Sequence, residues 1–254
     1  MKTFWSKIFS VLILAALTLS SAGALPVTQT APETAAAYIV QGYGTAETVR
    51  LVNRAGGEVT SQLDIIHSVG ARLSVTALAN LRGNPRIQQI TANAVARNSD
   101  QVIEGKKSGT PATDYADVSG ADLVWQEGIT GNGVGVAVLD TGLAPHPVLL
   151  KDTNGKPRKI VGWADFVEKS YKTPHDPNGH GTHVAGIIAN AQIGDDNEWN
   201  GTAPGVNLIG VRVLDKTGQG SYEGIIQGIQ WVIANKAKYN IRVMNLSLQS
   251  TVQS

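Results

Sequence analysis

The stretch GVGVAVLD, residues 133–140, decides the fold class of this chain. It is a nearly continuous run of apolar residues, which is typical of a strand buried on both faces of a parallel sheet. Further along, the pattern predicts buried strands at 207–214 and 241–248, and helices at about 180–191 and 221–239. Strands that alternate with helices predict an α/β fold built on a doubly wound parallel sheet.

In a sheet of this kind, functional groups gather at the carboxyl ends of the strands. Asp140 ends the first buried strand, and His180 opens the next predicted helix. A carboxylate can hold one imidazole N–H, fix the tautomer and stabilise the imidazolium, so that the other ring nitrogen can take a proton from a serine hydroxyl. Gly179 and Gly181 would let the backbone around His180 approach its neighbours closely. Asp140 and His180 are therefore predicted to form a proton-transfer pair.

Two sequence boxes resemble those of a known family. VAVLDTGL (136–143) and NGHGTHVAG (178–186) are similar to the aspartate and histidine boxes of the subtilisin-like serine peptidases, the subtilases. The segments at 201–222 and 243–248 are similar to later blocks of that family. The resemblance implies a subtilisin-like serine endopeptidase that forms an acyl-enzyme, with Asp140 as the orienting carboxylate and His180 as general base and acid.

The resemblance also implies how substrate and ions would bind. Polypeptide substrates would lie in a cleft with Gly218, Gln219 and Gly220 on one edge and Ser247 and Leu248 on the other. The chemistry would need no cofactor. Asp195, Asp196 and Asn197 gather oxygen ligands that suit either a solvated acidic loop or a structural calcium ion. Val148 stands where the family commonly has a calcium-binding acid, and Gln249 replaces a glycine that is usual in the substrate edge.

The sequence also departs from the family pattern. No Gly-Thr-Ser box follows His180, and no residue has the context of the family's oxyanion-hole asparagine. We therefore expect the amino-terminal part of a longer peptidase, with a sheet truncated at its C-terminus, and expect the 254-residue chain alone to be inactive. The alternative is a natural, non-catalytic module that binds peptides or its own propeptide.

The first part of the chain indicates export. Residues 1–24 have the pattern of a secretory signal peptide: two lysines, then an apolar run at 8–19, then an Ala-Gly-Ala end at residues 22–24. The run is shorter than the ~20 apolar residues that a membrane-spanning helix needs. We predict a secreted, extracellular protein with a linker at 25–37 and no membrane attachment once the signal is removed.

A small unit at 38–97 precedes the α/β domain. Its pattern predicts strands at 38–41, 63–66, 71–75 and 87–90, with helices at 47–55 and 76–81, the second capped by Thr76. The β-α-β-β-α-β order suits a split βαβ, ferredoxin-like α+β unit. It resembles the inhibitory propeptide of subtilases, which would act as an intramolecular inhibitor. Residues 98–116 are interpreted as a junction and residues 117–254 as the catalytic domain.

Other functions are disfavoured by the sequence. The net charge of +1 and the lack of a basic cluster argue against nucleic-acid binding, and the absence of cysteine excludes a thiol nucleophile. An aspartic peptidase would need a second Asp-Thr-Gly triplet, from this chain or from a dimer partner. A metal pair at His180 and His183 lacks an intervening glutamate and an obvious third ligand. We expect a monomer.

Overall fold

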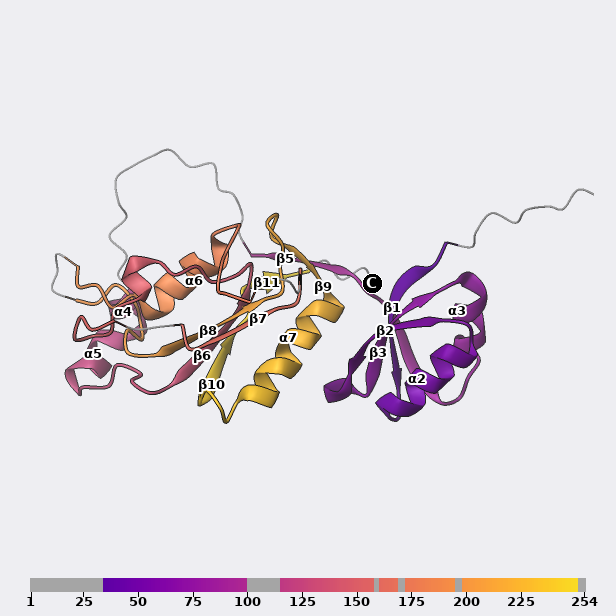
Figure 1. Cartoon of the computed structure of the whole chain (residues 1–254). Coiled ribbons are helices and arrows are strands. Elements are labelled where there is room, and N and C mark those ends of the chain that lie inside the picture. The colour runs from indigo at the N-terminus through magenta and orange to yellow at the C-terminus, as the bar shows by residue number, and fades with distance from the viewer. Residues whose placement is uncertain (1–33, 100–114, 158–159, 169–171, 195–197, 251–254) are drawn as a thin grey trace, which may run out of the picture. The chain divides into compact units, whose positions relative to one another are not determined.

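The computed structural model describes residues 34–99, 115–157, 160–168, 172–194 and 198–250 (Figure 1). Its first elements are strands and helices β1 (Ala36–Gly42), α2 (Thr45–Arg54), β2 (Glu58–Leu63), β3 (Ser68–Leu73), α3 (Val75–Arg82), β4 (Ile87–Ala92) and β5 (Val95–Asn98). The later ones are α4 (Tyr115–Ser119), α5 (Ala121–Gln126), β6 (Gly135–Asp140), β7 (Gly162–Asp165), α6 (His180–Ala189), β8 (Asn207–Arg212), β9 (Gln219–Ser221), α7 (Tyr222–Asn235), β10 (Ile241–Asn245) and β11 (Leu248–Gln249). Two short 3-10 turns, η1 (Asp64–Ile66) and η2 (Pro147–Leu149), complete the set.

The four strands β10-β6-β8-β7 form a parallel sheet in that order. All six residues of β6 are buried, because helices cover both faces of the sheet. Val138 belongs to a core cluster with Ala185 of α6, whereas its neighbour Leu139 belongs to a second cluster with Val232 of α7. Successive side chains of a strand point to opposite faces, so an apolar run without alternation is what this environment requires. The prediction of an α/β fold with a parallel sheet is confirmed.

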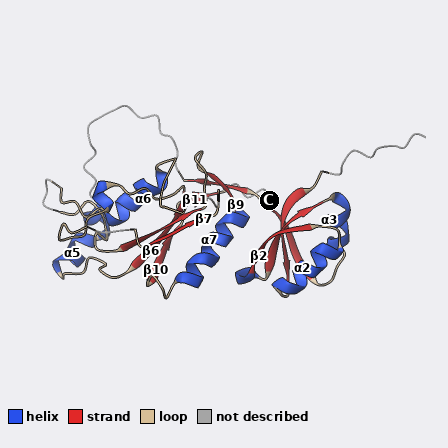
Figure 2. Ribbon diagram, viewed as in Figure 1, coloured by secondary structure: helices blue, strands red, loops and turns tan. Residues whose placement is uncertain are grey.

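A second, antiparallel sheet precedes it, with strand order β2-β3-β1-β4. Figure 2 shows the helices α2 and α3 on one face of this sheet. Val40, Val52, Val69, Leu73 and Leu81 form its buried core. The chain order β1-α2-β2-β3-α3-β4 is the order that the sequence pattern predicts, while the inhibitory role of this unit remains a prediction.

Several predicted boundaries were wrong. Residues 64–66 form a 3-10 turn instead of the end of a strand, so β2 begins earlier and ends at Leu63. Ser74, not Thr76, caps α3, because its hydroxyl accepts the backbone N–H of Ala77 at 3.1 Å. The strand predicted at 241–248 divides into β10 and β11, which belong to different sheets. The sequence pattern did not predict β5, β7, α4 or α5; most of these are short, and short elements carry little periodic signal.

Candidate active site

The carboxyl end of β6 meets the first turn of α6. His180 Nδ1 and Asp140 Oδ1 are 2.6 Å apart, and both side chains are nearly inaccessible to solvent. Asp140 Oδ1 also accepts the backbone N–H of Thr141 at 2.7 Å. A carboxylate in this position holds the imidazole with its Nδ1 toward Asp140, which presents Nε2 as the atom that can exchange a proton with a substrate or a nucleophile.

Two glycines flank His180 at the start of α6, and each is required for a different reason. A side chain on Gly181 would place its Cβ 2.2 Å from the carbonyl oxygen of Gly142 and 2.9 Å from Asp140 Cβ, so the close approach itself requires glycine. Gly179 serves differently, because nothing lies near its Cβ position but its φ of +98° is a left-handed conformation. The expectation of close packing therefore holds for Gly181 and is wrong for Gly179, whose backbone angle is what needs glycine.

The buried environment of Asp140 disfavours the ionised form of its carboxyl group. Burial raises the pKa of this carboxyl above the ordinary value of 3.8, and hydrogen bonds from His180 and Thr141 oppose the rise. Among the described residues, Oδ2 of Asp140 has no hydrogen-bond partner. A carboxyl whose folded pKa is raised stabilises the fold at low pH, and this contribution is lost as the pH rises through the folded value. The ionised Asp140 therefore costs stability at neutral pH.

Asp176 joins the two elements that carry this pair. One of its oxygens accepts Thr141 Oγ1 at 2.8 Å and the backbone N–H of Gly179 at 2.8 Å. The other oxygen accepts the backbone N–H and the hydroxyl of Thr182, at 2.8 and 2.7 Å. The turn at residues 176–179, directly before α6, is thus folded around one carboxylate.

A buried arginine holds the preceding loop. Arg212 ends β8 directly opposite Asp140 in the sheet and is fully buried. Its guanidinium donates to Asp165 and Glu168, each at 3.1 Å, and lies 3.3 Å from His175 Nε2. A buried charge is stable only when it is paired, so these contacts hold Asp165, Glu168 and His175 to the end of β8.

Strand β5 lies between β9 and β11 and forms a three-stranded antiparallel sheet with them. Ala96 pairs with Gly220 and Arg97 with Gln219 on one side, and Asn98 pairs with Leu248 on the other. The backbone N–H of Asn98 donates to Gly218 at 2.9 Å, and that of Ser99 to Ser247 at 3.1 Å. An extended segment therefore fills the space between the two predicted substrate edges.

The structure brings the predicted residues into two groups. Asp140 and His180 form the pair between β6 and α6. The residues predicted to form the edges of the substrate cleft are those that flank β5: Gly218, Gln219, Gly220, Ser247 and Leu248. Asp195, Asp196 and Asn197 lie outside the described residues, so the calcium hypothesis stays a prediction.

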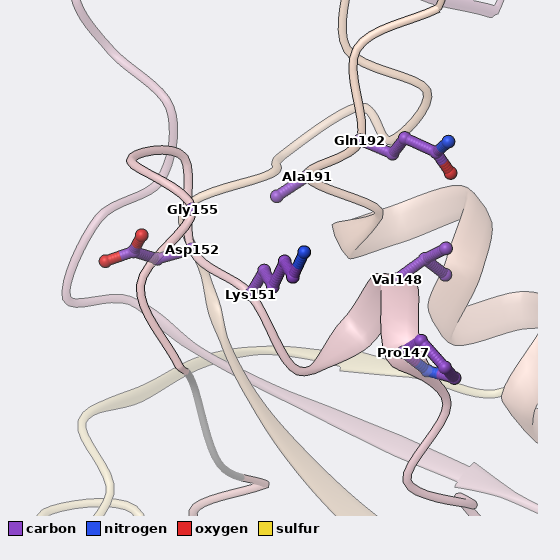
Figure 3. A pocket seen from close by; sticks show the side chains of 7 residues that line it. All are labelled: Pro147, Val148, Lys151, Asp152, Gly155, Ala191 and Gln192. Carbon is purple, nitrogen blue, oxygen red and sulfur yellow. The ribbon is translucent and has the colours of Figure 1, made fainter.

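Over the described part of the chain, no three His, Cys, Asp or Glu side chains gather as a metal-binding group. Val148 of η2 packs against an apolar core cluster. It also lines a pocket of about 360 Å³ with Pro147, Lys151, Asp152, Gly155, Ala191 and Gln192 (Figure 3). In Figure 3 the Asp152 side chain points away from Lys151 and the pocket, and its Oδ1 already accepts two backbone N–H groups. This pocket contains none of the predicted site residues.

Asp215 shapes the turn before β9 by accepting the backbone N–H and hydroxyl of Thr217, at 2.7 and 2.6 Å, and the N–H of Gln219 at 3.1 Å. Burial alone would raise the pKa of Asp215, but these hydrogen bonds and the charge of Arg212 lower it below the ordinary 3.8. A lowered carboxyl pKa stabilises the fold above the ordinary value, and this contribution is lost as the pH falls through the folded value.

Asp215→Ala is therefore expected to lower the free energy of unfolding at pH 5–7 and to flatten its decline below about pH 4. Urea denaturation at a series of pH values measures both effects. Thr217→Val, which removes one of the donors, should produce a smaller change in the same direction. An acid limb in Asp215→Ala as steep as in the unaltered chain would show that Asp215 does not contribute to it.

Sequence reasoning did not identify Asp176 or Arg212 as parts of the site. The Asp-Pro-Asn-Gly turn at 176–179 could have indicated the first, because aspartate commonly accepts backbone N–H groups of the residues that follow it. A lone arginine in the otherwise apolar 208–214 stretch could have indicated the second, because a buried charge needs partners.

The chain is similar to known proteins over most of its length. Residues 131–254 match the model of the subtilase family. The chain is 38% identical to a thermostable alkaline protease of Halalkalibacterium halodurans over 204 residues, an alignment that covers 76% of this chain and 48% of that protein. It is 33% identical to subtilisin E of Bacillus subtilis over 201 residues, which are 78% of this chain and 46% of subtilisin E. It is 43% identical to serine protease AprX of the same species over 127 residues, which are 47% of this chain and 26% of AprX. The chain thus spans about half or less of the length of these curated relatives.

None of the helices in the described ranges is both long and apolar enough to cross a bilayer.

Proposed function

The chain belongs to the subtilase family, and from this premise we propose that it forms part of a serine endopeptidase that hydrolyses polypeptides through an acyl-enzyme. The observation that carries the proposal is the 2.6 Å contact between Asp140 Oδ1 and His180 Nδ1 at the carboxyl end of a parallel strand. The family supplies the reaction class, and this contact supplies the proton-transfer pair that the reaction needs.

In this mechanism His180 Nε2 takes the proton of a serine hydroxyl as the serine oxygen attacks the scissile carbonyl carbon. Asp140 stays ionised and stabilises the imidazolium that forms. His180 then gives the proton to the leaving amine, which departs with the C-terminal part of the substrate. A water molecule then gives a proton to His180 and attacks the acyl carbon, and His180 returns that proton to the serine oxygen as the ester bond breaks, which releases the acyl group as a carboxylic acid. We assign neither the serine nor the oxyanion donor to any residue of this chain, because the sequence has no Gly-Thr-Ser box.

We propose that substrates bind as extended strands between Gly218–Gly220 and Ser247–Leu248. This is supported by β5, which pairs antiparallel with β9 and β11. A strand held on both sides by backbone hydrogen bonds gains affinity without regard to its side chains, which suits a peptidase that accepts varied sequences. Position 220 requires glycine, because a Cβ there would lie 2.2 Å from the carbonyl oxygen of Val213.

The unit at 38–97 would act as an intramolecular inhibitor because its last residues form β5, which lies between β9 and β11. A second contact supports this role. Glu223 in the first turn of α7 accepts Thr60 Oγ1 at 2.9 Å and Asn93 Nδ2 at 3.2 Å, and its own N–H donates to Asn93 Oδ1 at 3.0 Å. The inhibitor unit therefore has polar anchors outside the strand that fills the cleft.

We propose that the protein is secreted, on the basis of the signal-peptide pattern at 1–24. The catalytic chemistry requires no cofactor, and a structural calcium ion at 195–197 remains a hypothesis. The proposed enzyme acts as a monomer on polypeptides, without nucleic-acid or membrane partners.

Fluorophosphonate labelling tests the function, because the probe reacts only with an activated serine. We expect no labelling of the isolated 254-residue chain, and labelling of a longer gene product that carries a Gly-Thr-Ser box after the inhibitor unit is cleaved. Labelling of the 254-residue chain would overturn the view that its nucleophile is missing. A folded chain that binds peptides, and whose reading frame carries no such box, would support the non-catalytic alternative.

A further inference from the structure

We propose that Asp176 is a positioning residue for the catalytic pair, one that holds His180 against Asp140 by tying the segment after β6 to the first turn of α6. The catalytic consequence of this inference rests on the proposed peptidase function. The positioning itself rests only on the contacts among the described residues.

The carboxylate of Asp176 is saturated with hydrogen bonds. Oδ1 accepts the hydroxyl of Thr141 at 2.8 Å and the backbone N–H groups of Gly179 and Asn178 at 2.8 and 3.2 Å. Oδ2 accepts the backbone N–H and the hydroxyl of Thr182 at 2.8 and 2.7 Å. These donors come from both sides of the site, so one side chain connects two elements that are distant in sequence.

The connected residues are the immediate neighbours of the catalytic pair. Thr141 follows Asp140, while Gly179 and Thr182 lie on either side of His180. Thr141 Oγ1 also accepts the backbone N–H of Gly181 at 3.0 Å while it donates to Asp176. The backbone positions of both catalytic residues are therefore set by one continuous network, and that network passes through Asp176.

The network requires a carboxylate. Both oxygens of Asp176 accept a backbone N–H, one from Gly179 and the other from Thr182. An asparagine amide has one oxygen and one NH₂ group, so in either orientation its NH₂ would face a backbone N–H donor. A negative charge also suits the N-terminus of α6, where backbone N–H groups point outward.

The titration of Asp176 agrees with this arrangement. Burial alone would raise its pKa, but the N–H of Gly179 and the hydroxyl and N–H of Thr182 lower it below the ordinary value of 3.8. Asp176 also stands close enough to Asp140 for its charge to raise the pKa of that carboxyl. Among the described residues near this loop, Arg212 contacts His175, Asp165 and Glu168.

Proton NMR of the 254-residue chain tests the positioning without any peptidase activity. With ¹⁵N-labelled histidine, the Nδ1–H of His180 in its short hydrogen bond should give a downfield signal, assigned by its loss in His180→Ala. Asp176→Asn and Asp176→Ala should both abolish this signal. Asp152→Ala is the matched control, because Asp152 also accepts backbone N–H groups in its own loop but contacts neither element of the site; the signal should persist there.

The asparagine variant separates a carboxylate-specific role from a space-filling one. Asparagine has nearly the size of aspartate, so it would restore the signal if Asp176 only filled space. Circular dichroism and urea denaturation establish that each variant is folded. A His180 signal that is unchanged in a folded Asp176→Asn variant would overturn the proposal. If every Asp176 variant failed to fold, Thr141→Val would be the second test, because it removes one hydrogen bond of the network and should weaken the signal. An unchanged signal in Thr141→Val would also overturn the proposal.

Kinetics of the complete enzyme test the catalytic consequence. Asp176→Asn should lower kcat on the order of 10²-fold, the effect of misplacing a catalytic group by about 1 Å, with little change in KM. A loss that appears in KM alone would contradict the positioning role. If the NMR signal depends on Asp176 but no form of the complete protein hydrolyses peptides, the proposed function fails while the positioning stands.

Discussion

Replacing His180 with alanine in the complete enzyme is expected to lower kcat on the order of 10⁶-fold. The imidazole is the group that takes the serine proton and later returns it to the leaving amine, so both halves of the reaction lose their proton carrier. KM should change little, because His180 is nearly buried and the proposed substrate edges lie on β9 and β11. Steady-state hydrolysis of a chromogenic peptide, after removal of the inhibitor unit, measures the loss.

His183 provides the matched control for this substitution. It lies on the same helix in the next turn and is exposed, and we assign it no catalytic role. His183→Ala should keep activity within a few-fold of the unaltered enzyme. Near-normal turnover in His180→Ala would remove the general base from the mechanism, and with it the proposed reaction.

Asp140→Asn is expected to lower kcat on the order of 10⁴-fold. In the unaltered chain, Asp140 Oδ1 accepts both the Nδ1–H of His180 and the backbone N–H of Thr141. If the asparagine oxygen keeps both donors, the side chain no longer carries the charge that stabilises the imidazolium. If the amide turns its NH₂ toward His180, it forces the tautomer in which Nε2 carries the proton and cannot accept another. Both orientations lower the rate.

The same variant should not lose stability at neutral pH. Because burial raises the pKa of Asp140, its ionised form costs folding free energy, and the asparagine removes that charge. The urea midpoint at pH 7 is therefore expected to stay equal to or above that of the unaltered chain. Asp152→Asn, in an exposed loop turn away from the site, controls for the chemical change and should leave kcat intact. An Asp140→Asn enzyme with near-normal kcat would contradict the role of Asp140.

Predictions that depended on apolar pattern succeeded where the elements are long and buried. The parallel strands β6 and β8 and the helices α6 and α7 all begin or end within a few residues of the predicted positions. In β6 every side chain is buried, so an unbroken apolar run is sufficient evidence for it. Elements with weak or mixed patterns, such as β7 and β5, were not predicted, because half-exposed short strands contain few residues that report burial.

The polar contacts of the site could be predicted from the sequence only in part. Asp140 and His180 could be paired in advance, because a strand end and a helix start in an α/β sheet meet at one edge. The contacts of Asp176 with Thr141, and of Arg212 with Glu168, join segments whose local patterns contain no sign of each other. Such partners become neighbours only after the sheet has assembled.

The sequence by itself determined the parallel sheet, the helices that cover it and the two residues at its edge. Buried positions need apolar side chains, and this pattern can be seen in the local sequence of each strand and helix. Only the tertiary structure decided that β5 lies between β9 and β11, and that Asp176 joins the end of β6 to the start of α6. Backbone pairing and hydrogen bonding depend on distance and direction between groups far apart in the chain, and those quantities exist only in the folded molecule.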